Sequence, residues 1–325
     1  KYRMKRSGWN QLMARYPFFF ALMLLILALI VNYILQPNLF AGERLNDNMR
    51  VFLPLLLLSI GQAVVILGGG IDISVGGIVS IVNTVLATRV GLDGTPEKMW
   101  QYAALCIIIG LIAGAINGFF IAYLRLQPII TTYATSFLYA GFAMFILPNP
   151  GGGIPADISA IYRNTTPLGL PLAFYIIPLF LLLWWYLRST RYGKYLFAVG
   201  GKAQAAYETA VPVTQVQFST YLVSGLMSAF AGIAITMLTG SGNSEIGSPM
   251  TLNSITAVVI GGTAMSGGIG GVAGPMIGSI TLGLIMNIIS FANIDTWWQT
   301  FVNASIIVIA LATPGVINLL QRRRK

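Results

Sequence analysis

The sequence predicts an all-α, polytopic integral membrane protein with about ten transmembrane helices. Charged residues make up 9% of its 325 residues and hydrophobic residues 56%, whereas a soluble domain carries about 25% charged residues. The apolar residues fall in runs of about 17–25, the length at which a helix crosses a hydrocarbon core of about 30 Å. These runs rarely alternate as the strands of a membrane barrel do. Because helices satisfy their backbone hydrogen bonds internally, as lipid requires, we expect helices throughout.

The apolar runs give the predicted helices in order. The first begins at Pro17, is long enough to span, and lacks a small-residue cleavage site, so we interpret it as a retained helix. We treat residues 1–325 as a single transmembrane domain. Run lengths place the spans at 17–36, 51–69, 73–90, 101–124, 128–147, 171–188, 215–239, 251–267, 271–291 and 298–319.

The basic residues predict the orientation of the chain. The net charge is +10, but the basic residues flank apolar runs, as topology signals do, so we predict no nucleic-acid partner. With both termini in the cytoplasm, the inner segments hold 14 of the 19 Lys and Arg residues. These are Lys1, Arg3, Lys5, Arg6, Arg15, Arg125, Arg188, Arg191, Lys194, Lys202, Arg322, Arg323, Arg324 and Lys325. The pair Trp297–Trp298 fits an anchor at the outer interface.

Two glycine-rich stretches, 68–77 and 261–271, interrupt the apolar pattern. Each follows an apolar run and leads into another, which indicates two half-repeats. Transporters are often built from repeats with glycine-interrupted helices at the substrate site. Glycines also let helices approach closely, which explains one cluster better than two matched ones. The span count does not decide which symmetry relates the halves.

The longest predicted inner segment covers about 188–213. It is basic, breaks at Gly200-Gly201, and continues with helix-forming residues up to Glu208; Pro212 then ends it. A short helix here could dock a cytoplasmic partner, or the segment could be a simple connector. The residues alone favour neither reading.

Catalytic chemistry is absent from the sequence. There is no histidine, which removes the commonest general base and metal ligand. The single cysteine, Cys106, lies in an apolar run and allows no disulfide framework or metal cluster. The Gly193-Lys194 and Gly201-Lys202 pairs lack the other residues of a phosphate-binding loop. We therefore predict no catalytic residues, no metal site and no cofactor in this chain, and hence no enzyme.

Asp72 is the one acidic residue predicted where two apolar runs meet. It could bind a substrate hydroxyl or an ion, but a cap on the following helix is favoured, because Ile73 opens a helical run. The other polar residues in spans are neutral and suit either an uncharged polyhydroxylated solute or bonding between helices, the latter being favoured for any single one. They include Gln62, Ser74, Asn83, Thr84, Asn117, Thr131, Thr132, Thr135, Ser224, Asn253, Thr256 and Asn287.

Four stretches carry a resemblance to a known family. Gly69-Gly70-Ile71-Asp72-Ile73-Ser74-Val75-Gly76 is similar to Gly-Gly-Ile-Asp-Leu-Ser-Val-Gly, and 127–135 to Pro-Phe-Ile-Val-Thr-Leu-Ala-Thr. Residues 192–206 are similar to Gly-Arg-x-x-x-Ala-x-Gly-Gly-Asn-x-x-Ala-Ala, and 261–271 to Gly-Gly-Thr-x-x-x-Gly-Gly-x-Gly. These signatures belong to the permease subunits of bacterial ABC importers for ribose, galactose, xylose and arabinose, which the chain resembles over roughly 51–318.

The resemblance implies a transmembrane subunit of a monosaccharide importer in the bacterial inner membrane, with both termini cytoplasmic. It implies a second permease, identical or related, cytoplasmic ATPase subunits that hold the ATP and Mg²⁺, an extracytoplasmic sugar-binding protein, and membrane lipid as partners. Docking on the ATPase would fall to Gly200, Gly201, Lys202, Ala205, Ala206 and Glu208. The substrate pathway would include Asp72, Ser74, Asn83, Thr131, Thr132 and Thr135.

The chain departs from the family pattern at Lys202, Ala210 and Pro212, on the docking surface, and at Tyr133, near the expected pathway. Another solute therefore stays open: a furanose signal, a nucleoside, riboflavin or a branched-chain amino acid. A secondary transporter or channel would need more ionisable groups in the membrane or a filter-like loop. A structural scaffold leaves the two glycine motifs unexplained, and an intramembrane enzyme is disfavoured most, since no nucleophile–base pair is present.

Overall fold

The computed structural model describes residues 19–292 and the single residues 295, 298, 301, 304, 305 and 308. Most of the predicted span 298–319, Trp297, and the basic residues of both termini fall outside this set. Within it the chain is helical, and the one β-bridge, between Gly151 and Gly242, is isolated. The predicted all-α class is therefore confirmed for the described residues.

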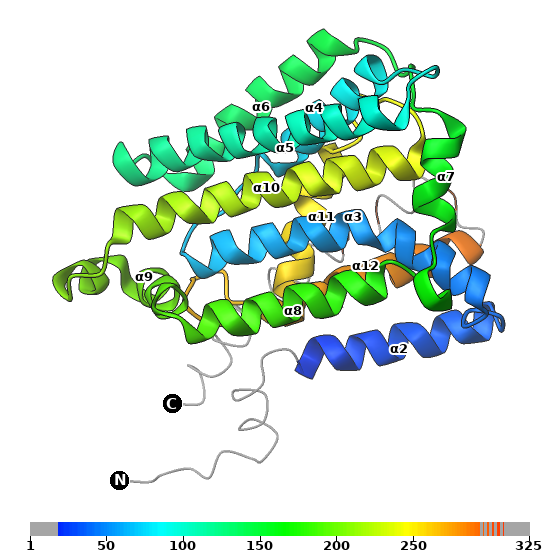
Figure 1. Ribbon diagram of the computed structural model, residues 1–325. Coiled ribbons are helices and arrows are strands. Elements are labelled where there is room, and N and C mark those ends of the chain that lie inside the picture. The colour runs from blue at the N-terminus through cyan, green and yellow to red at the C-terminus, as the bar shows by residue number, and fades with distance from the viewer. Residues whose placement is uncertain are drawn as a thin grey trace, which may run out of the picture.

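The helices form a layered bundle (Figure 1). Their bounds are α2 Phe19–Leu35, α3 Gly42–Leu67, α4 Val75–Arg89, α5 Pro96–Gly118 with a π-helical end at Phe119–Tyr123, α6 Pro128–Ile146, α7 Ala156–Asn164, α8 Ala173–Ser189, α9 Arg191–Glu208, α10 Val213–Thr239, α11 Ser248–Ile260 and α12 Ala273–Phe291. Five helices are long and apolar enough to cross a membrane, and the bent pair α8–α9 can make a sixth. Shorter apolar helices include α4 and α11. The count of ten spans stays a prediction.

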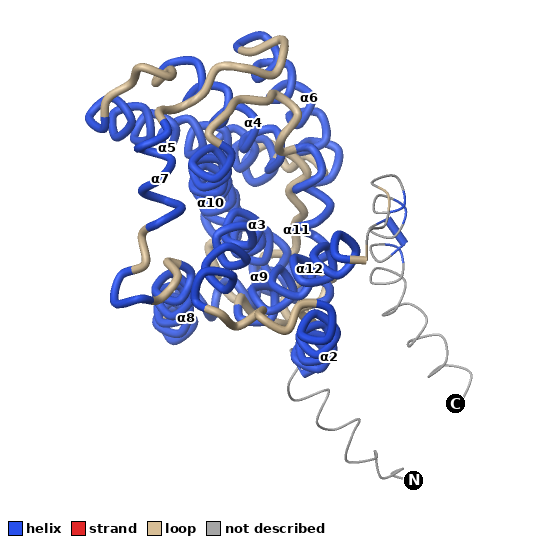
Figure 2. Tube along the Cα trace, turned by 90° about the vertical axis from the view of Figure 1, so that its right-hand side faces the viewer, coloured by secondary structure: helices blue, strands red, loops and turns tan. Residues whose placement is uncertain are grey.

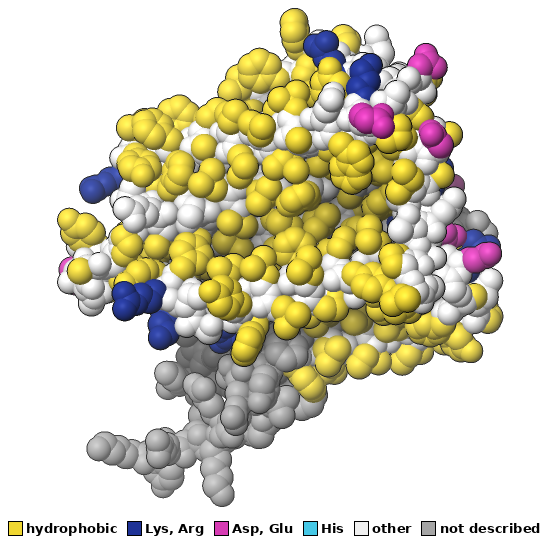
Figure 3. Space-filling view, in the orientation of Figure 1, with side chains coloured by type: hydrophobic (Ala, Val, Ile, Leu, Met, Phe, Trp, Pro, Cys, Tyr) yellow, Lys and Arg dark blue, Asp and Glu magenta, His cyan; other side chains and the backbone are white. Residues whose placement is uncertain are grey.

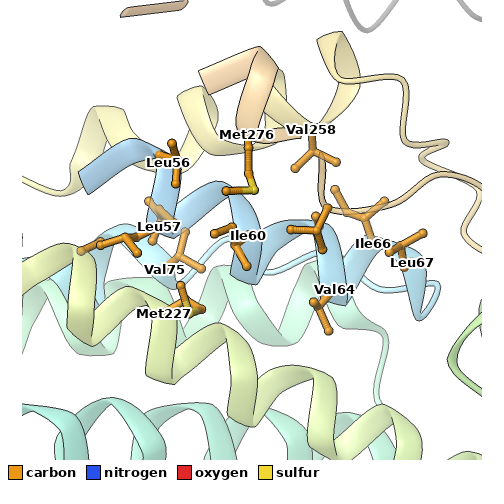
Figure 4. Close-up of a cluster of buried hydrophobic side chains, with 14 of the residues drawn as sticks. Leu56, Leu57, Ile60, Val64, Ile66, Leu67, Val75, Met227, Val258 and Met276 are labelled. Atoms are coloured by element: carbon orange, nitrogen blue, oxygen red, sulfur yellow. The ribbon is translucent and has the colours of Figure 1, made fainter. Parts of the chain in front are cut away.

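Helix α3 occupies the centre of the bundle and is buried on most sides. Its residues Leu56, Ile60 and Val64 belong to a cluster that also takes in Met227 of α10 and Met276 of α12 (Figure 4). Since lipid tails are as apolar as leucine, close packing holds such helices together more than the removal of apolar surface from water does. This packing fixes the rotation of α3, and with it the position of the glycine-rich segment that follows.

Small residues bring α5 and α10 into backbone contact. Gly110, Gly114 and Gly118 form a stripe on α5, and a side chain at Gly225 of α10 would overlap the carbonyl oxygen of Gly110. A Cβ at Gly118 would lie 2.9 Å from the Phe218 ring of α10. This is the close approach that small residues four apart allow in membrane helices. Helix α10 therefore joins α3 to α5.

Helices α3 and α10 run antiparallel: a Cβ at Gly61 would lie 2.9 Å from Met227 Cβ, and one at Gly68 would lie 3.0 Å from Thr220. Each is followed by an irregular segment, 68–74 or 240–247, and then by a short helix, α4 or α11. Helix, irregular segment and short helix thus follow one another twice, in opposite directions. The two half-repeats predicted from the glycine-rich stretches 68–77 and 261–271 stay a prediction.

The short helices α4 and α11 begin beside each other and make the same hydrogen bond twice. The Gly76 N–H donates to Thr251 Oγ1 at 3.1 Å. The Gly247 N–H donates to Ser80 Oγ, also at 3.1 Å. Gly76 thus bonds the hydroxyl four residues after Gly247, and Gly247 bonds the hydroxyl four residues after Gly76. A side chain on either glycine would overlap the backbone of the other. This reciprocity indicates an approximate two-fold relation with inverted direction.

Three chain breaks meet at one end of the bundle. The Gly268 N–H, after α11, donates to the carbonyl oxygen of Leu67, the last residue of α3, at 3.0 Å. Gly200 of α9 lies against both Leu67 and Gly268. A Cβ added at Gly200 would overlap the Leu67 oxygen and lie 2.7 Å from the Gly268 nitrogen. A Cβ at Gly267 would lie 2.6 Å from the Gly200 oxygen. The predicted break at Gly200-Gly201 therefore packs by backbone against both glycine-rich segments.

This end of the bundle, at the left of Figure 1, carries mostly basic side chains, and we call it the basic end. A hydrophobic band separates it from the opposite end, where acidic and basic side chains mix (Figure 3). The described charged residues of the basic end are Arg125, Arg188, Arg191, Lys194, Lys202 and Glu208. The basic end holds the described basic residues that were predicted to lie on the cytoplasmic side. The orientation of the chain in the membrane stays a prediction.

Ala210, which follows α9, has a left-handed backbone with φ 59°. An L-residue with a Cβ pays about 1–2 kcal/mol for this conformation, so Ala210→Gly is expected to stabilise the protein by about 1 kcal/mol. Ala205→Gly, in the exposed helix just before it, is the control and should destabilise by about 1 kcal/mol. Melting of the detergent-solubilised variants checks this; a lower melting temperature for Ala210→Gly would contradict it.

Candidate functional site

The acidic residue predicted at the first break lies in a buried hydrogen-bond network. Asp72 Oδ1 accepts from the backbone N–H of Ser74 at 2.9 Å and from Ser74 Oγ at 2.7 Å. Asp72 Oδ2 accepts from Ser224 Oγ of α10 at 2.7 Å. The Asp72 carboxylate thus accepts a backbone N–H directly before α4, which is close to the capping role favoured from the sequence. The N-cap position of α4 itself is occupied by Ser74.

The network continues into α5 and α6. Asn117 Nδ2 donates to Ser74 Oγ at 2.7 Å, and Thr135 Oγ1 donates to Asn117 Oδ1 at 2.7 Å. Thr132 Oγ1 donates to the carbonyl oxygen of Ile71 at 3.2 Å. These bonds satisfy polar groups that would be costly to bury unpaired. Together with the Ser224 bond, they join three helices, α5, α6 and α10, to the first break.

Two other residues predicted for the pathway make separate contacts. Thr131 Oγ1 donates to the carbonyl oxygen of Gln127 within its own helix at 3.0 Å. Asn83 of α4 holds the segment before α11: its amide donates to Thr236 Oγ1 at 2.9 Å and to the Ser241 oxygen at 3.0 Å, and it accepts from the Asn243 N–H at 2.7 Å. The six predicted pathway residues are buried and bonded, and their part in transport stays a prediction.

A groove of about 490 Å³ lies where the two short helices meet, between α4, α6 and α11. We call it the central groove. None of the six predicted pathway residues lines it. Its lining residues are Ile73, Gly76, Gly77, Ser80, Tyr133, Ser136, Phe137, Ala140, Met144, Ser244, Glu245, Ser248, Thr251 and Leu252.

The lining of the central groove suits a neutral, hydroxyl-rich molecule. Ser80, Ser136 and Thr251 line it with hydroxyl groups, and the first turns of α4 and α11, the positive ends of two helix dipoles, border it. Tyr133 and Phe137 are 55% and 62% exposed and present aromatic surface. The lining contains one carboxylate, Glu245, and no basic side chain.

The central groove runs beside the middle of α6, a helix long enough to span a membrane. In Figure 2, α4, α6 and α11 lie on the side of the molecule opposite α7 and α8. Polar groups at membrane depth are tolerated where they face protein or a water-filled cavity rather than lipid. The groove face is therefore suited to an aqueous pathway or to a second protein.

Most of the groove lining was missed from the sequence. The exceptions are Tyr133, which departs from the family pattern near the expected pathway, and Ile73, Gly76 and Gly77, which belong to the glycine-rich stretch 68–77. Glu245, Ser136, Ser248 and Thr251 were not among the predicted pathway residues. Gly247-Ser248-Pro249 was an available signal, because proline in the first turn marks a helix start. That start lies inside the interval predicted as a connection between spans 215–239 and 251–267.

The residues predicted to dock a partner lie at the basic end. Helix α9 kinks at Lys202, where φ is −162°, as the Gly200-Gly201 break predicts. Beyond the kink, Ala205 and Glu208 are exposed, Ala206 is buried at 4% exposure, and Gln204 Nε2 donates to Glu208 Oε1 at 3.2 Å. The short helix after the kink, 203–208, is called the coupling helix below. Its exposed face is open to a partner.

The described residues contain no group of three or more His, Cys, Asp or Glu side chains that could hold a metal ion. Cys106 is buried against α4, with its thiol 3.8 Å from the Val82 oxygen. The groups that the central groove does present are hydroxyls, helix ends and aromatic rings.

Comparison with known proteins gives a family and several relatives. Residues 44–311 match the family described as the branched-chain amino acid transport system permease component. The ribose import permease protein RbsC of Escherichia coli (strain K12) is 30% identical over 293 residues, covering 89% of this chain and 90% of that protein. RbsC of Bacillus subtilis (strain 168) is 31% identical over 295 residues, covering 89% of each.

A further relative is the autoinducer 2 import system permease protein LsrD of Photorhabdus temperata, 28% identical over 316 residues, covering 94% of this chain and 91% of that protein. No solved structure matches the chain. The family match covers most of the chain and includes both breaks, the central groove and the coupling helix. The chain therefore belongs to the family of branched-chain amino acid transport system permease components, and is a multi-pass membrane permease.

Proposed function

We propose that this chain is the transmembrane subunit of an ATP-driven, binding-protein-dependent importer that moves a monosaccharide into the bacterial cytoplasm. The observation that carries the proposal is the match to ribose import permeases over about nine-tenths of both chains. The neutral hydroxyls and aromatic rings of the central groove support a sugar. The chain supplies no ATP chemistry of its own; partner ATPase subunits bind ATP and Mg²⁺ and hydrolyse the nucleotide.

The groove chemistry separates the candidate solutes. A branched-chain amino acid carries two opposite charges, and the groove offers the Glu245 carboxylate but no basic side chain to pair with the solute's carboxylate. A sugar needs only hydrogen bonds and apolar contact, both of which the lining gives. Autoinducer 2 is the second candidate, because LsrD relatives import it and align over more than nine-tenths of this chain.

In the proposed cycle, a loaded binding protein docks at the mixed-charge end, which faces outward, and both termini lie in the cytoplasm. A second permease, a copy or a relative, covers the central groove, so that its polar face avoids lipid. ATP binding closes the ATPase pair against the coupling helices. Lys202, Ala205 and Glu208 make the contact, Ala206 packs into the hydrophobic core of the bundle, and the glycines at 200 and 201 connect the coupling helix to the bundle.

The motion reaches the pathway by backbone contact. Gly200 touches Leu67 at the end of α3 and Gly268 beyond the end of α11, and α11 lines the central groove. The pathway residues that bond between elements keep its walls joined as α4 and α6 change position; they are Asp72, Ser74, Asn83, Thr132 and Thr135. Thr131 stabilises the first turn of α6.

Purification of the tagged chain from its native host tests this proposal. We expect an ATPase subunit to co-purify, and reconstituted complex to take up ribose with its binding protein and ATP. Glu208→Arg should reduce ATPase retention at least ~tenfold, as loss of a docking charge does. Glu97→Arg, an exposed carboxylate change at the opposite end, should leave retention unchanged. A chain that purifies without any ATPase, under conditions that preserve such complexes, would favour a secondary transporter instead.

A further inference from the structure

A second groove, of about 480 Å³, lies at the basic end. One wall is the connection between α5 and α6, and the other is the coupling helix with the start of α10. We call it the inner groove. Its lining residues are Ile121, Ala122, Arg125, Leu126, Pro128, Ala203, Gln204, Tyr207, Val213, Thr214 and Gln217. No acidic residue is among them.

Arg125 is held in an unusual conformation at the edge of the inner groove. Its φ of 57° is in the left-handed region, just after the π-helical end of α5, a conformation in which many helices end and which glycine adopts more readily than arginine. Hydrogen bonds on both sides impose it: the Leu124 N–H donates to the Phe119 oxygen at 3.3 Å, and the Leu126 N–H to the Phe120 oxygen at 3.1 Å. The side chain is exposed and forms no ion pair with any described residue.

The opposite wall supplies neutral contacts. Tyr207 of the coupling helix is 67% exposed, and Leu126 across the groove is 48% exposed. Gln204 and Gln217 also line the groove, and the Gln204 amide donates to Glu208 Oε1 at 3.2 Å. The inner groove thus presents a cation without a counter-charge, beside a ring, an aliphatic side chain and amide donors. This set complements a carboxylate next to an apolar side chain.

The left-handed residue Ala210 follows the coupling helix, between the lining residues Tyr207 and Val213 in the sequence. In Figure 1 the end of α9 extends beyond the other helices at this end. A wall that extends beyond the bundle favours a protein occupant over a lipid headgroup at the bundle's edge.

We propose that the inner groove receives an acidic side chain of the ATPase subunit, with Arg125 as its partner. The inference rests on the proposed function and deepens it: the α5–α6 connection is a second docking element beside the coupling helix. A single short helix could rotate against the ATPase subunit. Contacts through both the coupling helix and the α5–α6 connection would fix the angle at which the ATPase subunit moves the bundle.

The test is retention of the ATPase subunit by tagged permease purified from its native host at increasing salt. Arg125→Glu is expected to lower retention at least ~tenfold, with the largest difference at low salt. Arg125→Gly should lower retention to a similar degree while the permease melts at the same or a higher temperature, because glycine accepts the left-handed backbone. Lys194→Glu, the same charge reversal outside the groove, should change retention less than ~twofold.

The outcomes separate the two proposals. If wild-type permease retains the ATPase and the Arg125 variants retain it equally, the inner groove is not a docking element, although the importer function stands. If Arg125→Glu loses bound anionic lipid but keeps the ATPase, the groove holds a lipid headgroup and the inference is wrong. If wild-type permease brings no ATPase, both proposals fail together.

Discussion

Gly200→Ala is expected to destabilise the protein by about 2–4 kcal/mol, whereas Gly201→Ala should be nearly neutral. The new Cβ at Gly200 would overlap the carbonyl oxygen of Leu67, which already accepts the Gly268 N–H at 3.0 Å. The backbone must shift, and the bond that joins α3 to the segment after α11 weakens. The neighbouring Gly201 has no atom within 4 Å of its Cβ position.

Melting of both variants in detergent, with size-exclusion profiles, measures this difference. The pair is well matched, because the two glycines are adjacent and lose the same backbone freedom when replaced. Equal melting temperatures would show that the three breaks are not packed as the structure has them.

Ser136→Trp is expected to reduce solute uptake at least ~tenfold without loss of the assembled complex. Ser136 lines the central groove, and its hydroxyl bonds only the Tyr133 oxygen of its own helix at 2.6 Å. An indole at this position would fill much of a groove of about 490 Å³ while leaving the bonds between helices in place. The effect should therefore fall on transport rather than on folding.

Leu138→Trp is the control for this experiment. Leu138 lies two residues further along α6, is 50% exposed and is not part of the groove lining, so the added indole should change uptake less than ~twofold. Uptake by reconstituted complexes, normalised to the ATPase content, is the measurement. Normal uptake by Ser136→Trp would exclude the central groove as the pathway.

The inverted arrangement explains how a movement at one end can reach the groove. Gly200 contacts the end of α3 and the segment after α11, one element from each half of the inverted pair. The short helices α4 and α11 then meet at Gly76 and Gly247, where the groove begins. In the proposed cycle, a shift of the coupling helix would act on both halves through these backbone contacts, which leave less freedom of movement than contacts between long side chains.

The sequence alone determined the helical class and several helix bounds closely. The run predicted at 128–147 is α6 at Pro128–Ile146, and the run at 271–291 is α12 at Ala273–Phe291. The kink at Gly200-Gly201 also followed from local chemistry. These features depend on run length, proline and glycine, which act within a few residues of themselves.

Longer-range features depended on the tertiary structure. Helix α3 begins at Gly42 rather than 51, because its polar first turns continue the helix beyond the apolar run. The hydrogen bond between Gly76 and Thr251 joins residues 175 apart, and the network from Ser224 to Thr135 crosses α10, α5 and α6. Hydropathy predicts that a segment is helical and apolar, but not its rotation, its depth or its neighbour. Those are set by close packing of glycines on facing helices, and that packing alone placed Ser80, Ser136 and Thr251 in one groove.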